Sequence, residues 1–200
     1  MAAHNSITSY VRHVFLRSNI IFFLLASLFL FILQFIQTFI TNLAFERTLI
    51  EHQEYWRLVT GGLVHANTPH LILNLIGLFL LLTLYENQIA LRVWSVISLL
   101  QVFCVNLAIY LMLPSTEFYL GFSGALHGLY SWYSVTEWRR RHSWFPVCVL
   151  LILFIKLGVD AISANSISTQ IIGMNVHWQS HWIGSITGIV LALLYKRKAA

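Results

Sequence analysis

The chain contains few charged residues. Asp, Glu, Lys and Arg make up only 10% of its 200 residues, whereas 58% are apolar, and the mean hydropathy is +0.74. In a soluble globular domain about a quarter of the residues are charged. The composition therefore excludes an ordinary water-soluble domain and predicts an integral membrane protein.

Cysteine is scarce as well. The two cysteines, Cys104 and Cys148, both fall in apolar segments, so we expect neither a structural disulfide nor a Cys-x-x-Cys metal site. The sequence also lacks low-complexity stretches, internal repeats and long linkers. A single membrane domain over residues 1–200 is therefore predicted.

Apolar segments long enough to cross a membrane recur along the chain. A hydrocarbon core of ~30 Å needs roughly 20 helical residues. The segments predicted to span it are 20–40, 70–85, 91–113, 123–138, 144–162 and 181–195. The first has no clear small-residue cleavage site, so we expect it to stay as a helix. The predicted fold class is all-α, a polytopic membrane protein built as a compact bundle of six transmembrane helices.

The basic residues predict how this bundle is oriented. Only Arg47 and Arg57 fall on one side of the six-span arrangement. Nine fall on the other: Arg12, Arg17, Arg92, Arg139, Arg140, Arg141, Lys196, Arg197 and Lys198. Loops rich in Lys and Arg stay in the cytoplasm, so both termini are expected there. Topology and anionic lipid headgroups account for the net charge of +5, and no nucleic-acid partner is expected.

Four potentially reactive side chains share one layer of the predicted bundle. His70, Asn74, Ser123 and His181 all lie near the non-cytoplasmic ends of their helices. A charged side chain in hydrocarbon costs about 2.5–3.5 kcal/mol, so polar groups there turn toward partners or a cavity. A cluster at one depth is therefore a candidate site.

Glycines explain how two of these groups could meet. One pair, Gly124 and Gly128, follows the serine, and a second pair, Gly184 and Gly188, follows the histidine. Such small-xxx-small pairs let helix backbones approach closely in lipid. Packing of one glycine face on the other would bring the hydroxyl to the imidazole. Ordinary helix packing, with the serine and histidine incidental, is the alternative interpretation.

The predicted chemistry is nucleophilic attack by serine. The hydroxyl of Ser123 needs a base to remove its proton, and a neutral His181 within hydrogen-bond reach could serve. The developing oxyanion needs fixed donors. The backbone N–H groups of Ser123 and Gly124, at the positive end of a helix, and the side chains of His70 and Asn74 are the candidates.

We expect no acidic residue in this layer to orient the imidazole of His181. Asp160 is the nearest candidate, but it lies one turn from Lys156 on the same helix. That spacing favours an intrahelical ion pair. The sequence therefore predicts a Ser-His dyad instead of a triad.

Together these residues resemble the rhomboid family of intramembrane serine proteases. The resemblance runs through Trp56-Arg57, His65 to Asn74, Gly121-Phe122-Ser123-Gly124 and His181 to Gly188. It implies a six-helix bundle in which Ser123 is the nucleophile, His181 the base, and His70 and Asn74 line the oxyanion hole. It also implies a membrane-anchored protein substrate that enters between the second and fifth helices.

Trp56 and Arg57 resemble the Trp-Arg pair in the first external loop of rhomboids. Anchoring at the membrane interface, by an aromatic ring and a cation, is an equally good interpretation of these two residues.

His127 departs from the family pattern. Many rhomboids carry a tyrosine four residues after the serine, packed on the catalytic histidine, whereas this chain has His127 there. We expect His127 to stack on His181 or to hydrogen-bond to it. The run Gly-Phe-Ser-Gly-Ala-Leu-His-Gly is similar to the rhombosortase branch, which implies a bacterial inner membrane, a site open to the periplasm, and substrates with a C-terminal Gly-Gly-type sorting tail.

The last external loop is polar, with Gly173 available as a hinge, and either a movable cap or an ordinary solvated loop fits it. Its polar residues are Ser163, Asn165, Ser166, Ser168, Thr169, Gln170 and Asn175.

Two other classes of protein remain open. The outer half of the bundle holds five histidines, His65, His70, His127, His177 and His181, which a metal- or haem-binding membrane protein would also explain. The His-Glu-x-x-His motif of metalloproteases is absent, so neither a metal nor another cofactor is expected. A non-catalytic rhomboid relative that binds membrane proteins is the other alternative, although such relatives usually lack the nucleophile or the base.

Overall fold

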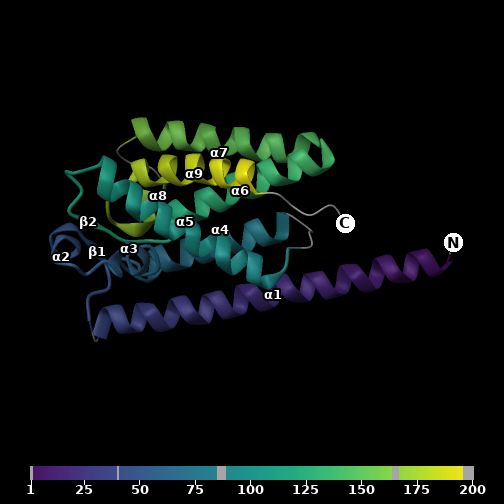
Figure 1. Ribbon diagram of the computed structural model, residues 1–200, viewed down its shortest axis with the longest axis horizontal. Helices are drawn as coiled ribbons and strands as arrows, with labels where there is room; N and C mark the ends of the chain where they lie inside the picture. Colours follow the sequence, from purple (N-terminus) through teal and green to yellow (C-terminus); the bar gives the residue numbers. More distant parts are fainter. Residues whose placement is uncertain (1, 40, 85–88, 164–166, 196–200) are drawn as a thin grey trace.

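Six long helices occupy the six apolar segments of the sequence. The computed structural model describes residues 2–39, 41–84, 89–163 and 167–195, with side chains from Asn19 onward except that of residue 167. The long helices within these ranges are α1 (Ala2–Phe39), α4 (Thr68–Leu84), α5 (Leu91–Met112), α6 (Ser123–Arg141), α7 (Trp144–Ile162) and α9 (Trp178–Leu194) (Figure 1). The all-α prediction is confirmed.

Three helices extend beyond the membrane spans predicted from the sequence, and the bounds of those spans remain predictions. α1 begins far before residue 20, because no glycine or proline precedes the apolar segment to end a helix. α6 continues to Arg141, where Glu137 pairs with Arg140 and Arg141 one turn further on. α9 begins three residues before His181, because the ring of His177 caps it by accepting the N–H of Ser180.

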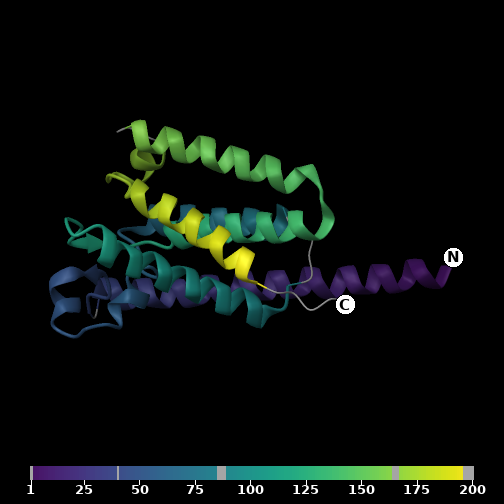
Figure 2. The same cartoon turned by 45° about the horizontal axis from the view of Figure 1, so that its top comes forward.

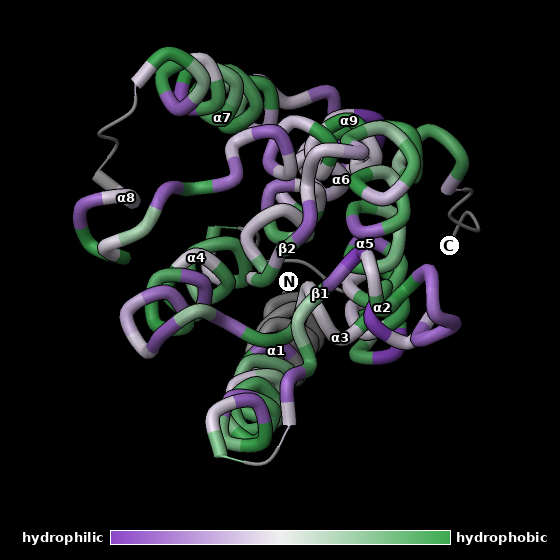
Figure 3. The backbone as a smooth tube through the Cα atoms, turned by 90° about the vertical axis from the view of Figure 1, so that its left-hand side faces the viewer, coloured by the Kyte–Doolittle hydropathy of each residue, from purple (hydrophilic) through white to green (hydrophobic). Residues whose placement is uncertain are grey.

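In the part of the chain that the structure describes, three stretches are long and apolar enough to cross a bilayer: residues 19–39 of α1, and the whole of α5 and α7. α4 is apolar but only 17 residues long, about 25 Å at 1.5 Å per residue. α6 is more polar because it is the central helix, packed against α4, α5, α7 and α9 (Figure 3). More than half of its residues are buried by protein instead of lipid. Six spans therefore remain a prediction.

The outer helices face lipid. Exposed apolar side chains cover α1, for example Leu24 and Leu28, and α7, for example Ile152 and Ile155. α1 lies along one side of the bundle on α4 and α5, and α9 crosses α6 obliquely (Figure 2). An apolar outer surface of this kind is what a protein surrounded by hydrocarbon presents.

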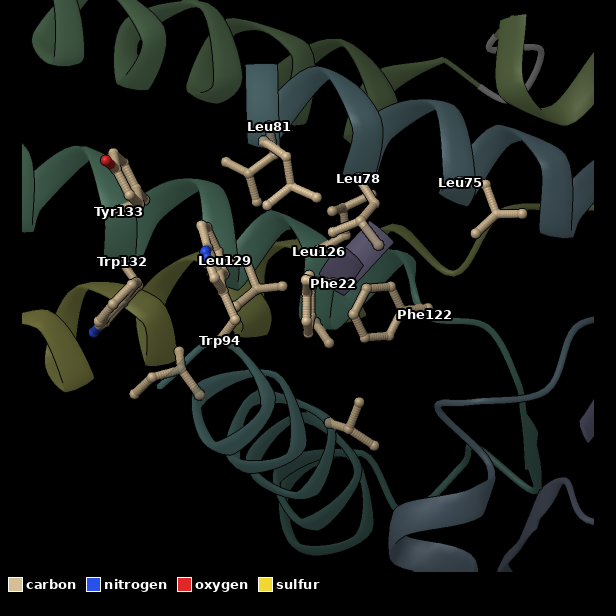
Figure 4. Packing of buried hydrophobic residues seen from close by; sticks show 14 of the residues in the cluster. Phe22, Leu75, Leu78, Leu81, Trp94, Phe122, Leu126, Leu129, Trp132 and Tyr133 are labelled. Atoms are coloured by element: carbon tan, nitrogen blue, oxygen red, sulfur yellow. The ribbon is translucent and has the colours of Figure 1, made fainter. Parts of the chain in front are cut away.

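Aromatic rings fill the core between α1, α5 and α6. The ring of Trp94 stacks on Phe22 at a centroid distance of 5.8 Å and on Tyr133 at 5.7 Å (Figure 4). Trp132 meets the edge of Trp94 at 6.3 Å. Offset and edge-on ring pairs contribute about 0.5–1.5 kcal/mol each beyond their burial. These contacts fix α6 in the bundle below the layer that contains Ser123.

Short elements that the sequence analysis did not predict close one end of the bundle. They are β1 (Phe45–Glu46), α2 (Arg47–Glu51), α3 (Arg57–Thr60), β2 (Phe118–Tyr119) and α8 (Ile167–Ile172) (Figure 1). β1 and β2 pair antiparallel, with Phe45 opposite Tyr119. The guanidinium of Arg47 donates to four carbonyls in the last turn of α5 and just after it, those of residues 109, 110, 113 and 116. Such donors replace the missing bonds of a helix C-terminus.

Arg92 and Arg139 to Arg141 lie on helix ends at the opposite end of the bundle from these loops (Figure 1). Arg12 and Arg17 lie on the part of α1 whose side chains are not described, and Lys196, Arg197 and Lys198 lie outside the described residues. The distribution of the described cations agrees with the expected orientation, which remains a prediction.

Candidate active site

The two glycine pairs pack face to face, as the sequence suggested. A Cβ atom built on Gly184 would overlap the carbonyl oxygen of Gly124, and one built on Gly188 would overlap that of Gly128. The backbones of α6 and α9 are therefore in direct contact at two successive turns. No side chain other than hydrogen fits at these positions of α9.

This contact brings Ser123 and His181 together. Nε2 of His181 lies 3.0 Å from Oγ of Ser123, which is hydrogen-bond distance. His181 is only 3% exposed, whereas Ser123 is partly exposed at the start of α6. The hydroxyl thus has a buried proton acceptor on one side and open space on the other.

The loop before Ser123 is held in an unusual backbone conformation. Gly121 has φ +121°, which favours glycine, and a Cβ there would strike the ring of His70. The hydroxyl of Tyr119 donates to the carbonyl of Gly121 at 3.0 Å. Burial raises the pKa of Tyr119, so this donor keeps its proton. The sequence analysis missed Tyr119, because nothing in its spacing points to the carbonyl that it binds.

His65 also holds the loop before Ser123. Its Nε2 accepts the N–H of Phe122 at 3.5 Å, and its ring meets the edge of the His70 ring at 5.1 Å. Burial, and next the proximity of His70, lower the pKa of His65 to about 3. His65 is therefore a neutral acceptor that positions the residue before Ser123.

His70 and Asn74 lie on the face of α4 that looks toward Ser123. The amide of Asn74 donates to the carbonyl of His70 at 3.0 Å. The side chain of Asn67 accepts the N–H of His70 at 2.9 Å, which caps the helix. Both candidate oxyanion donors are thus fixed by the first turns of α4.

His127 stacks on His181, one of the two arrangements that the sequence analysis expected. The rings are 4.1 Å apart at 12°. Nδ1 of His127 lies 2.7 Å from the carbonyl oxygen of Ser123, and its Nε2 lies 3.1 Å from Nζ of Lys156. His127 thus packs on the imidazole of His181 and adds a polar link to α7.

The expectation that no acidic residue reaches His181 was wrong. Oδ2 of Asp160 lies 3.4 Å from Nδ1 of His181. The expected ion pair with Lys156 is also present, with Nζ 2.6 Å from the same oxygen. α7 packs against both α6 and α9. A carboxylate on its inner face can therefore contact Lys156 of its own helix and His181 of α9 at once. A pattern along one helix cannot report this contact between helices.

A cavity of about 770 Å³ opens beside Ser123. Side chains from α4, α6, α7 and α9 line it, together with three residues of α8 and residues 174–177 of the loop between α8 and α9. Figure 3 shows α8 between the ends of α4 and α7. Of the predicted site residues, it is lined by His70, Asn74, Ser123, His127 and His181. Apolar side chains such as Leu73, Leu126 and Leu153 share the lining with these polar groups, a mixture typical of binding sites.

Trp56 and Arg57 do not line this cavity. Arg57 is buried, donates to Glu54 at 2.7 Å and to the carbonyl of Ala44 at 2.7 Å, and lies over the ring of Trp56 at 4.4 Å. Trp56 itself is exposed. Arg57 thus fixes the loop between α1 and α4, and of these two residues only Trp56 is exposed enough to contact lipid.

The last external loop contains helix as well as coil. The side chain of Asn67 donates to the carbonyl of Ile172 at 2.8 Å, which ties α8 to the start of α4. Gly173 follows with φ +73°. Asn165 and Ser166 of the predicted cap lie outside the described residues. A cap at this place remains a prediction.

Comparison with known proteins decides the family, because the Rhomboid domain matches residues 52–198. The chain belongs to the rhomboid family. Over 155 residues this rhomboid is 24% identical to "Putative rhomboid protease YdcA" of Bacillus subtilis (strain 168), a match that covers 74% of the chain and 71% of that relative. Rhomboids are intramembrane serine proteases that act on membrane proteins within the bilayer. The family resemblance is therefore confirmed, whereas the rhombosortase branch remains a prediction.

Proposed function

We propose that this rhomboid cleaves a peptide bond in or next to the membrane anchor of a protein substrate, with Ser123 as nucleophile and His181 as general base. The observation that carries the proposal is the distance of 3.0 Å between Oγ of Ser123 and Nε2 of His181 beside a cavity. The imidazole takes the hydroxyl proton as the oxygen attacks the carbonyl carbon, and returns it to the leaving amine. Water then hydrolyses the acyl-enzyme.

The oxyanion is stabilised by donors around the start of α6. The N–H groups of Ser123 and Gly124 belong to the first turn, whose helical bonding begins with the N–H of Leu126. The side chains of His70 and Asn74 face the same cavity from α4. The positive end of the α6 dipole adds to their effect.

The substrate class follows from the resemblance to rhombosortases. His127 and the Gly-Phe-Ser-Gly run support a bacterial exported protein with a C-terminal Gly-Gly-type sorting tail. The position of Arg92 and Arg139 to Arg141 supports cytoplasmic termini in the inner membrane and a site open to the periplasm. A polypeptide without bulky side chains at the cleaved bond fits a nucleophile between closely packed helices.

Metal or haem binding is less well supported. His127 and His181 each use both ring nitrogens in hydrogen bonds, so neither offers a free ligand atom. Within the described residues no group of three His, Cys, Asp or Glu side chains is placed to hold a metal ion. A non-catalytic role is also less well supported, because nucleophile and base are both present at bonding distance.

Covalent labelling tests the proposed function directly. A fluorophosphonate probe is expected to modify the purified protein in detergent, with peptide mapping by mass spectrometry placing the probe on Ser123. His181→Ala should lose at least 99% of the labelling rate, because the hydroxyl loses its base. His52→Ala, in the external loop and outside the cavity, is the matched control and should label normally. A label on another residue, or equal labelling of both variants, would refute the proposal.

Asn74→Ala tests the oxyanion donors. Loss of one such donor slows the chemical step by about 10²-fold, so kcat for a model membrane substrate should fall by that factor at nearly constant KM. Thr83→Ala, near the other end of α4 with its hydroxyl on a helix carbonyl, is the control. A change in kcat of less than twofold for Asn74→Ala would show that Asn74 is not an oxyanion donor and contributes only to packing.

A further inference from the structure

We propose that Asp160 is a positioning residue for His181. Lys156 holds the carboxylate of Asp160 in place, and His127 holds the backbone of Ser123. The proposal rests on the function proposed above, and adds three groups on α6 and α7 to a site otherwise made of a dyad. The starting observation is that one carboxylate oxygen, Oδ2 of Asp160, contacts both Nδ1 of His181 and Nζ of Lys156.

The position of these charges within α7 calls for an explanation. Lys156 and Asp160 are the only charged residues of α7, whose other positions are almost all apolar. Charged side chains in a membrane helix are unfavourable and commonly mark a functional pathway. Asp160 is 9% exposed and points into the bundle, not toward lipid. An ion pair needed only for stability could be replaced by apolar residues without loss.

With Asp160 ionised, Lys156 protonated and both imidazoles neutral, the bonding capacity of each group permits only one arrangement of protons. A carboxylate can only accept, so Nδ1 of His181 must carry the proton that it shares with Asp160. Nε2 of His181 is then free to accept from the hydroxyl of Ser123, as a general base requires. Asp160 thus selects the tautomer in which His181 can take the proton of the nucleophile.

The tautomer of His127 is determined in the same way. An ammonium group only donates, so Nε2 of His127 accepts from Lys156 and its Nδ1 carries a proton. That proton is donated to the carbonyl oxygen of Ser123 at 2.7 Å. Lys156 therefore connects the carboxylate that orients the base with the ring that holds the backbone of the nucleophile.

These contacts form a closed ring of five groups. It runs from Ser123 through His181, Asp160, Lys156 and His127 back to the carbonyl of Ser123. Every donor in the ring faces an acceptor. The contact of 3.4 Å between Asp160 and His181 is its longest, and such contacts commonly shorten when substrate binds. The stacked imidazoles of His127 and His181 add rigidity to this closed set of contacts.

Asp160→Asn tests the positioning role. The side-chain amide can donate to Nδ1 of His181 and so favour the tautomer that cannot accept from Ser123. We expect kcat for a model membrane substrate to fall by about 10²-fold or more, with KM within twofold, since a wrong tautomer blocks the chemistry and not binding. Glu137→Gln is the matched control, because Glu137 is also a buried carboxylate paired with cations, at the other end of α6. It should retain wild-type kcat per folded molecule.

A double-mutant cycle tests the ring. Lys156→Met should lower kcat as well, and the variant with both replacements should be no slower than Asp160→Asn alone, because the two residues act as one unit. Effects that multiply would show that Lys156 acts independently and would overturn its place in the ring.

The tautomer of His181 can be measured by NMR on the unaltered protein, so this test does not depend on whether a variant folds. With ¹⁵N-labelled histidine, the His181 ring, assigned by comparison with His181→Ala, should show a protonated Nδ1 and an unprotonated Nε2. The opposite tautomer, or an equal mixture, would overturn the proposal. If Asp160→Asn cleaves at the wild-type rate while Ser123→Ala is inactive, Asp160 has no positioning role but the proposed function stands. If Ser123→Ala also cleaves, the proposed function itself fails.

Discussion

Ser123→Ala is expected to remove cleavage of a membrane-anchored substrate, with kcat falling by about 10⁶-fold, as when a serine protease loses its nucleophile. The physical reason is that no other hydroxyl stands at bonding distance from Nε2 of His181 among the described residues. Fluorophosphonate labelling should disappear in the same variant. The measurement is the rate of appearance of cleaved substrate in detergent and in lipid vesicles.

Ser131→Ala is the control for this experiment. Ser131 lies two turns further along α6, and its fully buried Oγ has no hydrogen-bond partner within the described part of the chain. Removing that hydroxyl leaves the cavity unchanged, so cleavage should continue at the wild-type rate. Equal loss in both variants would indicate a defect in packing instead of a lost nucleophile. Residual cleavage above one part in 10³ in Ser123→Ala would assign the chemistry to another group, because removing the nucleophile leaves a far smaller rate.

Gly184→Leu is expected to disrupt the bundle and abolish activity. Any Cβ at this position meets the carbonyl oxygen of Gly124, which belongs to the backbone and cannot rotate away. Overpacking in a core typically costs about 1–3 kcal/mol, and here α9 must also move away from α6. A displacement of 1 Å between reacting groups already lowers the rate by about 10²-fold. Thermal unfolding in detergent and the cleavage rate report the two effects.

Gly158→Leu provides the matched comparison. A Cβ on Gly158 of α7 would meet no atom within 4 Å. The same replacement there should leave the unfolding temperature unchanged or higher, because leucine favours a helix by several tenths of a kcal/mol over glycine. Full activity of Gly184→Leu would disprove the proposed origin of the short distance between Ser123 and His181.

The sequence was most informative where a pattern lies along one helix. The apolar segments predicted all six long helices, and the two glycine pairs predicted which faces of α6 and α9 meet. Reactive residues beside those glycines then located the cavity. Each of these inferences needs only helical periodicity and the size of a side chain, which are local properties of the chain.

Contacts between distant segments could not be predicted in this way. Asp160 reads as an ion pair with Lys156, because that partner lies four residues away, whereas His181 lies 21 residues further along the chain. The β1–β2 pairing and the bonds from Arg47 to the end of α5 depend on a loop whose residues carry no periodic signal. Irregular segments are specified by particular hydrogen bonds, which only coordinates reveal.

The central position of α6 has a consequence for how this rhomboid responds to its lipids. Membranes differ in thickness, and a helix adapts to a mismatch by tilting. α1 and α7 expose the most apolar surface, so we expect them to take up such adjustments first. The backbones of α6 and α9 are in direct contact and should keep the hydroxyl and its acceptor at a constant separation. Bilayer thickness should therefore alter the width of the substrate entrance predicted between α4 and α7 and leave the reacting pair undisturbed.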